Sequence, residues 1–159
     1  MDRLLKDPRA WGLMMAAMLT IMSNATITPS LPGLEARFAD DPRAATLTRL
    51  LITAPSLLVA IVAPFAGSLT DRLGRRKPLL GGMVIYTVAG TAGLYLDSIE
   101  AILVSRLVLG LGVASIMTSQ AALVGDYFEG PARGRLMGYQ IAATNLGGLV
   151  FVSVAGVLA

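Results

Sequence analysis

The stretch GSLTDRLGRRKPLL, residues 67–80, places five charges within seven residues between two long apolar runs. The charged residues are Asp71, Arg72, Arg75, Arg76 and Lys77. Asp71 and Arg75 are near enough in sequence to form an ion pair, and Gly74 permits a turn that a β-carbon would crowd. Asp126, at the end of a later apolar run, is a third candidate for the same cluster.

Arg106 is a charge within an apolar run, roughly 8 Å from the outer end of that run at 1.5 Å per residue. Because an ionised side chain inside a membrane is costly, such a residue predicts a functional role. The alternative is that the long side chain extends to the outer membrane interface, which this shallow depth allows.

The composition indicates a membrane protein rather than an enzyme. Hydrophobic residues make up 55% of the chain and charged residues 14%, with a mean hydropathy of +0.70, whereas a soluble domain carries about 25% charged residues. The chain has no Cys and no His, which removes thiolate chemistry and the commonest metal ligand. With no Ser–His or Cys–His pair and no paired buried carboxylates, we expect no catalysis, no metal and no cofactor.

The apolar residues fall into about five runs long enough to cross a membrane, since a spanning helix needs about 20 mostly apolar residues. The runs are residues 11–32, 50–70, 78–96, 101–125 and 137–158. They do not alternate as barrel strands do, and no long linker separates them. The first is too long for a signal peptide. We therefore expect an all-α, multi-pass membrane protein in which residues 1–159 form one bundle.

The basic residues indicate the orientation of the chain. They gather in the N-terminal tail and in the connections 70–77 and 126–136, whereas the connection DSIE, residues 97–100, has none. The positive-inside rule places the N-terminus and both basic connections in the cytoplasm and the C-terminus outside an inner or plasma membrane. This distribution explains the net charge of +3, so we expect a lipid bilayer and no nucleic acid as partner.

Local signals mark helix ends and contacts. Asp97 and Glu100 have the D-x-x-E spacing of a capping box, and Pro78 suits the first turn of a helix. Small residues recur at intervals of four or eight, a pattern that lets helix backbones approach closely in lipid. The stripes are Ala63 and Gly67; Gly110, Ala114, Thr118 and Ala122; and Gly148 and Gly156. The simplest interpretation is that they pack the bundle.

Read as G-x-L-x-D-R-x-G-R-R-K between the second and third spans, the opening stretch resembles the signature of the major facilitator superfamily of 12- or 14-span secondary transporters. The stretches SRLVLGLGVA and DYFEGPARGRLMGY are similar to that family's fourth span and following loop. The resemblance, to a drug-efflux-like branch, implies that the chain supplies the first five helices of an N-terminal half, an incomplete six-helix bundle of the major facilitator fold.

The resemblance also implies a role for the charged connection. In the family, the matching acid and arginine latch the outward-facing state, and the acid faces a helix N-terminus in the C-terminal half. The residues that take this role by resemblance are Gly67, Asp71, Arg72, Gly74, Arg75, Arg76 and Asp126. For Asp126, the alternative is an ordinary exposed ion pair.

In related drug/proton antiporters, the arginine that matches Arg106 is implicated in proton coupling. Such coupling ordinarily needs a buried acid, yet all ten acids lie in tails, connections or span ends. The antiporter motif of the fifth span is also eroded, with Phe151 and Val152 in place of a Gly-Pro pair. A coupling carboxylate would therefore come from other sequence, or the coupling is of another kind.

Polar side chains on the first, fourth and fifth spans are candidates for a substrate path. They are Asn24, Thr28, Ser115, Ser119, Gln140, Thr144 and Asn145. Each is as well suited to a hydrogen bond between helices as to a ligand contact, and Asn24 and Gln140 are the strongest candidates.

Two functions are consistent with this sequence. The first is a secondary active transporter, or part of one, that exports a small organic molecule by alternating access. Since the family builds its cavity from two six-helix halves, we then expect a missing C-terminal half or homo-oligomeric copies as partner. The alternative is a non-transporting remnant or a helix-packing membrane scaffold. Further spans downstream of Ala159 would favour the transporter.

Overall fold

The computed structural model describes residues 3–25, 31–39, 42–92 and 95–158. In this part of the chain all regular structure is helical. The elements are η1 (Arg3–Lys6), α1 (Pro8–Ala25), α2 (Leu31–Arg37), α3 (Ala44–Leu73), α4 (Arg76–Thr91), α5 (Ile99–Tyr127) and α6 (Gly130–Leu158). The expected all-α fold class is confirmed.

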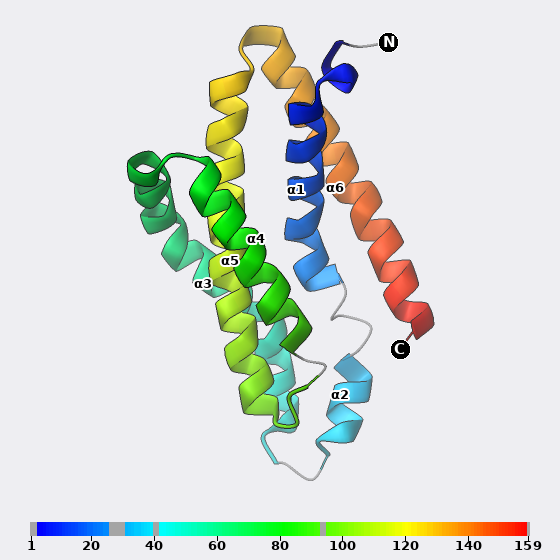
Figure 1. The fold of residues 1–159 in the computed structure, drawn as a ribbon. Coiled ribbons are helices and arrows are strands. Elements are labelled where there is room, and N and C mark those ends of the chain that lie inside the picture. The colour runs from blue at the N-terminus through cyan, green and yellow to red at the C-terminus, as the bar shows by residue number, and fades with distance from the viewer. Residues whose placement is uncertain (1–2, 26–30, 40–41, 93–94, 159) are drawn as a thin grey trace.

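The helix α5 is the centre of the arrangement. It packs along α3 and α4 and also against α1, and α1 in turn packs along α6. By contrast, α5 and α6 diverge from their connection and make few contacts with each other (Figure 1). This divergence leaves α1 beside both helices and opens space between them.

The two ends of the bundle differ in charge. Figure 1 shows the N-terminus, the α3–α4 connection and the α5–α6 connection at one end, and α2 with the α4–α5 connection at the other. The first will be called the basic end, and its basic residues are Lys6, Arg9, Arg72, Arg75, Arg76, Lys77, Arg133 and Arg135. The three segments expected to share one side of the membrane therefore share one end of the molecule.

Three helices are long and apolar enough to cross a membrane by length and composition: Ala45–Leu73, Ile99–Tyr127 and Gly130–Val154. Over their described lengths, α1 with 18 residues and α4 with 16 do not meet that test. Some helix ends also differ from the expected spans. The helix α3 begins at Ala44 rather than at 50, and a separate helix, α2, begins at Leu31. Helices extend beyond the apolar runs because backbone hydrogen bonding needs no apolar side chains.

Glycines bring α5 against its neighbours. A β-carbon on Gly82 of α4 would lie 2.9 Å from the carbonyl oxygen of Gly112, and one on Gly112 would lie 2.9 Å from that of Gly82. A β-carbon on Gly110 would likewise lie 2.9 Å from the carbonyl oxygen of Pro55 in α3. Gly110, the first residue of its stripe, thus packs closely against α3. Gly67 has no atom within 4 Å of such a β-carbon, so any close approach there involves a partner outside the described residues.

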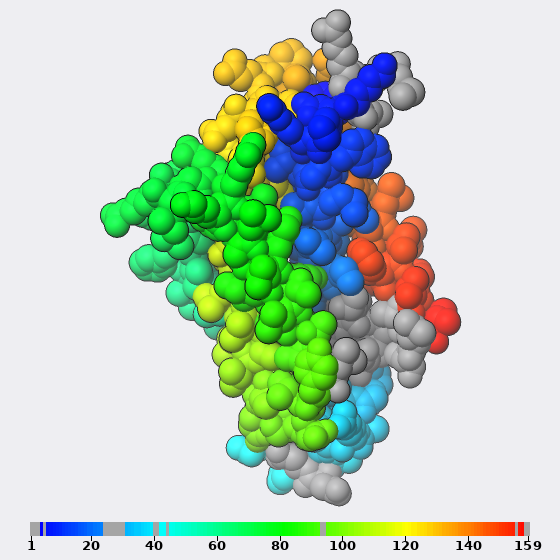
Figure 2. Space-filling model, viewed as in Figure 1, coloured from blue at the N-terminus to red at the C-terminus, as the bar shows by residue number. Residues whose placement is uncertain are grey.

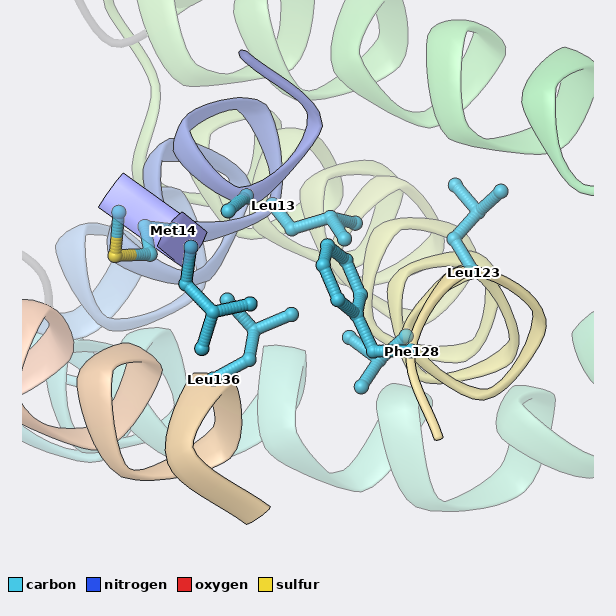
Figure 3. Close-up of a cluster of buried hydrophobic side chains, with 8 residues drawn as sticks. Leu13, Met14, Leu123, Phe128 and Leu136 are labelled. Carbon is cyan, nitrogen blue, oxygen red and sulfur yellow. The ribbon is translucent and has the colours of Figure 1, made fainter. Parts of the chain in front are cut away.

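A buried apolar cluster joins three helices near the basic end (Figure 3). It contains Leu13 and Met14 of α1, Leu123 of α5, Phe128 just after α5, and Leu136 of α6. Leu4 of η1 is part of the same cluster. Because α5 and α6 hardly touch elsewhere, this cluster and α1 hold α6 to the rest of the bundle.

At the opposite end, the N-cap of α5 lies one residue later than the predicted Asp97. Ser98 is the N-cap, and its hydroxyl oxygen accepts from the backbone N–H of Ala101 at 3.2 Å. The expected capping box of Asp97 and Glu100 is therefore wrong. Asp97 pairs instead with Arg37 at 3.0 Å, and Glu100 with Arg43 at 3.1 Å. These two ion pairs join the end of α2 and the start of α3 to the start of α5.

Candidate functional site

The charged connection between α3 and α4 is a tight turn built on a glycine. The helix α3 ends at Leu73, Gly74 has φ +80°, and α4 begins at Arg76. A residue with a β-carbon rarely adopts this backbone conformation, which glycine adopts freely. The turn brings Arg75 back toward the last turn of α3, and Pro78 lies in the first turn of α4, as expected.

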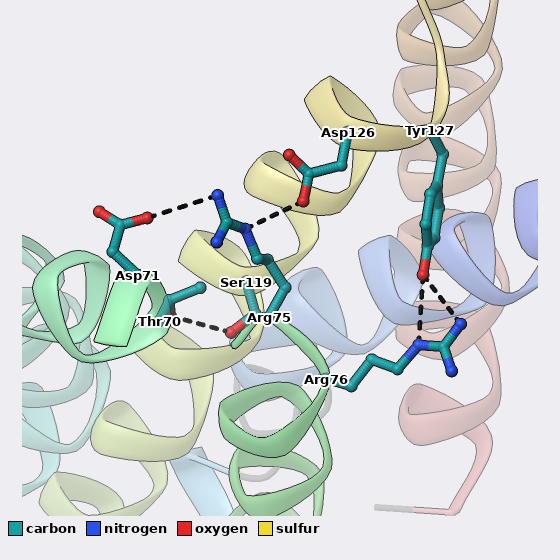
Figure 4. A network of polar contacts seen from close by, with 7 residues as sticks. All are labelled: Thr70, Asp71, Arg75, Arg76, Ser119, Asp126 and Tyr127. Atoms are coloured by element: carbon teal, nitrogen blue, oxygen red, sulfur yellow. Dashed lines mark hydrogen bonds and ion pairs between the residues drawn. The ribbon is translucent and has the colours of Figure 1, made fainter. Parts of the chain in front are cut away.

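Arg75 lies between two carboxylates from different helices (Figure 4). Its Nε is 2.9 Å from Oδ2 of Asp126 in α5, and its Nη2 is 3.8 Å from Oδ1 of Asp71 in α3. The three side chains that were expected to cluster are thus together. They are partly exposed, at 37% for Arg75, 45% for Asp126 and 72% for Asp71, so the pairs add little to the free energy of unfolding. Their effect is to set how the α3–α4 turn lies on α5.

The two remaining arginines of the turn behave differently. Arg76 donates from Nε and Nη2 to the hydroxyl oxygen of Tyr127, at 3.2 and 3.1 Å. Tyr127 also lies beneath Arg9 of α1, whose Cζ is 5.0 Å from the ring centroid. Arg72 is exposed in the last turn of α3. Sequence reasoning missed Tyr127, and its position next to Asp126 at a helix end was the one available signal.

Beneath the charged turn, a hydroxyl pair joins α3 to α5. The Oγ atoms of Thr70 and Ser119 are 3.2 Å apart, and both residues are fully buried. The Thr70 hydroxyl also donates to the carbonyl oxygen of Ala66 at 2.7 Å. Because a hydroxyl has a single proton, Ser119 is the donor to Thr70. Ser119 was expected on a substrate path, but it lies within a helix interface.

Arg106 points into the bundle. Its Nη1 donates to the backbone carbonyl oxygen of Ser23 in α1 at 3.2 Å. Leu109 of α5 and Tyr86 and Thr87 of α4 line the same small cavity. This geometry favours a role within the bundle over an arginine that extends to the outer interface. The role itself stays a prediction.

A cavity of about 380 Å³ lies among α1, α5 and α6, where α5 and α6 diverge. Gln140, Thr144 and Asn145, three of the residues predicted for a substrate path, line it together with Thr20, Gln120 and Arg133. Gln140 donates from Nε2 to the carbonyl oxygen of Leu13 at 3.3 Å. Oε1 of Gln120 is buried with no hydrogen-bond donor among the described residues. The cavity is otherwise mostly apolar and can hold an amphipathic molecule.

The other expected path residues lie elsewhere. Ser115 is on the side of α5 that faces α4, with its Cβ 2.9 Å from where a Gly82 β-carbon would be. Thr28 lies outside the described residues, as does the side chain of Asn24. Within the described ranges, no group of three or more acidic side chains is placed to hold a metal ion.

The long apolar helices define a helical, multi-pass membrane protein, with a partly open cavity among α1, α5 and α6. Residues 13–159 match the family model of the Major Facilitator Superfamily, and the chain belongs to this superfamily of transporters, which are not enzymes.

More than fifty curated proteins match part of the chain, among them the two that follow. The "Quinolone resistance protein NorA" of Staphylococcus aureus (strain Mu50 / ATCC 700699) is 24% identical over 110 residues, which are 69% of this chain and 28% of that protein. The "Probable vesicular acetylcholine transporter-B" of Danio rerio is 30% identical over 110 residues, 69% of this chain and 22% of that protein. The matched segment thus spans about a quarter of each relative.

Proposed function

We propose that this chain is part of a secondary active transporter that exports a small organic molecule by alternating access. Family membership supports the class of activity. The printed name of NorA, a resistance protein, supports the outward direction. The mostly apolar cavity with a few polar groups suits an amphipathic substrate, and Gln140, Thr144 and Asn145 are its proposed contacts.

The observation that carries the proposal is Arg75 between Asp71 and Asp126. These two ion pairs hold the α3–α4 turn on the end of α5, in the orientation in which the turn would meet a partner bundle. Alternating access needs two states that differ by a few kcal/mol at most, so even a weak ion pair can shift their ratio. In this proposal Gly67, Arg72, Gly74 and Arg76 complete the latch.

The latch acts against a second helical bundle, either in the same polypeptide or in another chain. An exposed apolar face of α3 supports such a partner, because Phe65, Leu69 and Leu73 are four residues apart and share that face. In the proposed orientation, the basic end faces the cytoplasm at an inner or plasma membrane. Arg106 is the proposed coupling residue, with its guanidinium held by the backbone of α1.

The test is efflux from vesicles that contain the intact gene product, with a panel of neutral, anionic and cationic amphipathic dyes. We expect Arg75→Ala and Asp71→Asn to lower the rate by up to about fivefold, since a partly exposed ion pair contributes at most about 1 kcal/mol to the balance between the two states. Arg49→Gln is the control, because Arg49 is exposed at the opposite end of α3.

The outcomes of this test distinguish the transport proposal from the latch proposal. A folded, inserted wild-type protein that moves none of the dyes would contradict transport and favour a helix-packing scaffold. Normal rates for both latch variants would contradict the latch and leave the transport proposal standing.

A further inference from the structure

Two guanidinium groups meet on one uncharged side chain at the basic end. Arg76, the first residue of α4, donates two hydrogen bonds to the Tyr127 hydroxyl, and Arg9 of α1 lies over the Tyr127 ring. The phenol accepts hydrogen bonds and attracts cations through its ring, but it carries no negative charge. Tyr127 therefore gathers two positive charges without neutralising them.

None of the described carboxylates at the basic end forms an ion pair with Arg9 or Arg76. Asp71 and Asp126 pair with Arg75, and Asp7 accepts from the backbone N–H of Arg9 rather than from its guanidinium. Within the described part of the chain, neither Arg9 nor Arg76 forms an ion pair. Lys77, next to Arg76, and Lys6, three residues before Arg9, add two exposed positive charges. The two arginines thus have no carboxylate partner among the described residues, and guanidinium groups bind phosphate well because their donors match its oxygens.

The residues that follow Arg76 along α4 indicate which kind of molecule supplies the anion. Leu80, Val84 and Val88 follow Arg76 at intervals of four residues, and they are 62, 63 and 67% exposed. Residues four apart share one face of a helix, so an apolar stripe leads away from the arginine into the membrane. Figure 2 shows α4 and α1 at the surface on this side, with the basic end uppermost. A phosphate joined to an acyl chain fits both features, whereas a free phosphate would use only the first.

We propose that Arg9, Arg76 and Tyr127 form a binding site for the phosphate of an anionic membrane lipid, with its acyl chain along Leu80, Val84 and Val88. An anionic headgroup is preferred because a zwitterionic one would bring its own cation near two guanidinium groups. The lipid links the ends of α1 and α4 through α5, next to the turn that holds Arg75. The site is independent of any transported substrate.

The test is native mass spectrometry of the purified full chain in detergent, with phosphatidylglycerol and phosphatidylcholine of identical acyl chains. We expect phosphatidylglycerol to be retained in preference. Each basic residue near an anionic lipid surface contributes about fivefold in affinity. We therefore expect Arg9→Gln to lower phosphatidylglycerol affinity about fivefold, and Arg9→Gln with Arg76→Gln about thirtyfold. Tyr127→Phe keeps the ring but loses the acceptor that holds Arg76, so its loss should be smaller.

Arg72→Gln is the matched control, because it removes the same charge from the same end of the molecule at a residue away from Tyr127. Equal retention of the two lipids, or an equal loss in Arg72→Gln, would overturn the site and leave only a general attraction to basic residues. Displacement of the lipid by inorganic phosphate at equal concentration would show a free-phosphate site instead. Should the double variant fail to fold, Arg9→Gln decides alone, since Arg9 is exposed.

Discussion

Single residues at the basic end act through backbone geometry as much as through charge. Arg75 reaches Asp126 because Gly74, one residue earlier, takes φ +80° and reverses the chain within two residues. A residue with a β-carbon at position 74 would disfavour that turn. The ion pairs of the charged motif therefore depend on Gly74, because its backbone conformation places Arg75 near Asp126.

The hydroxyl pair between α3 and α5 gives a prediction at the same scale. In Thr70→Val, the Ser119 hydroxyl loses its acceptor inside the protein, whereas in Ser119→Ala only a lone pair of Thr70 loses its donor. A buried donor without a partner costs about 1–3 kcal/mol, more than a single lost hydrogen bond. We therefore expect Thr70→Val to lower the free energy of unfolding more than Ser119→Ala.

The measurement is denaturant unfolding in detergent of both single variants and of the double variant. The double variant should be more stable than the sum of the two single losses predicts, because neither partner is then left alone. Additive losses would show that the two hydroxyl groups are not coupled.

At the scale of elements, α5 organises the bundle because glycines let α3 and α4 approach it. At the crossing of α4 and α5, each glycine lies against the backbone of the other helix. Such contacts suit a membrane, where helices associate through close packing rather than by escaping water.

Two adjacent glycines of α4 allow the close packing of α4 against α5 to be tested. Gly82→Ala places a β-carbon 2.9 Å from the Gly112 carbonyl oxygen and from Ser115 Cβ, whereas Gly81 has open space. Overpacking of this kind costs about 1–3 kcal/mol. We expect Gly82→Ala to lower the midpoint of thermal unfolding in detergent, while Gly81→Ala leaves it unchanged or raises it, since alanine favours helices. Equal effects at the two positions would contradict the crossing.

At the scale of the whole molecule, the two ends are distinct and can be assigned to the two sides of a membrane. The chain has no cysteine, so single cysteines can be introduced without background. Glu129, between α5 and α6 at the basic end, and Glu35, in α2 at the other end, are both exposed.

We expect Glu35→Cys to react with a membrane-impermeant maleimide on intact cells, and Glu129→Cys to react only after permeabilisation. The physical reason is the excess of basic residues at the end that carries Glu129. Expression levels of the two variants serve as the control. The reverse labelling pattern would contradict the proposed orientation but not the fold.

Much of the fold and part of the site could be predicted from sequence because they depend on local features. Long apolar runs that do not alternate form helices in a membrane, since a helix satisfies each backbone polar group within its own segment. Asp71, Gly74 and Arg75 lie within five residues, so their turn and one of their ion pairs follow from spacing alone. The motif in that turn was also enough to indicate the family that the comparison confirmed.

What depends on how each helix is rotated could not be predicted in the same way. The helix α5 is apolar on all sides, so nothing in its sequence shows that Ser119 faces α3 while Gln120 faces the cavity. Likewise, Tyr127 meets Arg9 and Arg76 only because the ends of α1, α4 and α5 converge. The sequence by itself determined the helices and the charged turn. Tertiary structure alone decided which polar side chains face one another, because helix contacts set those rotations.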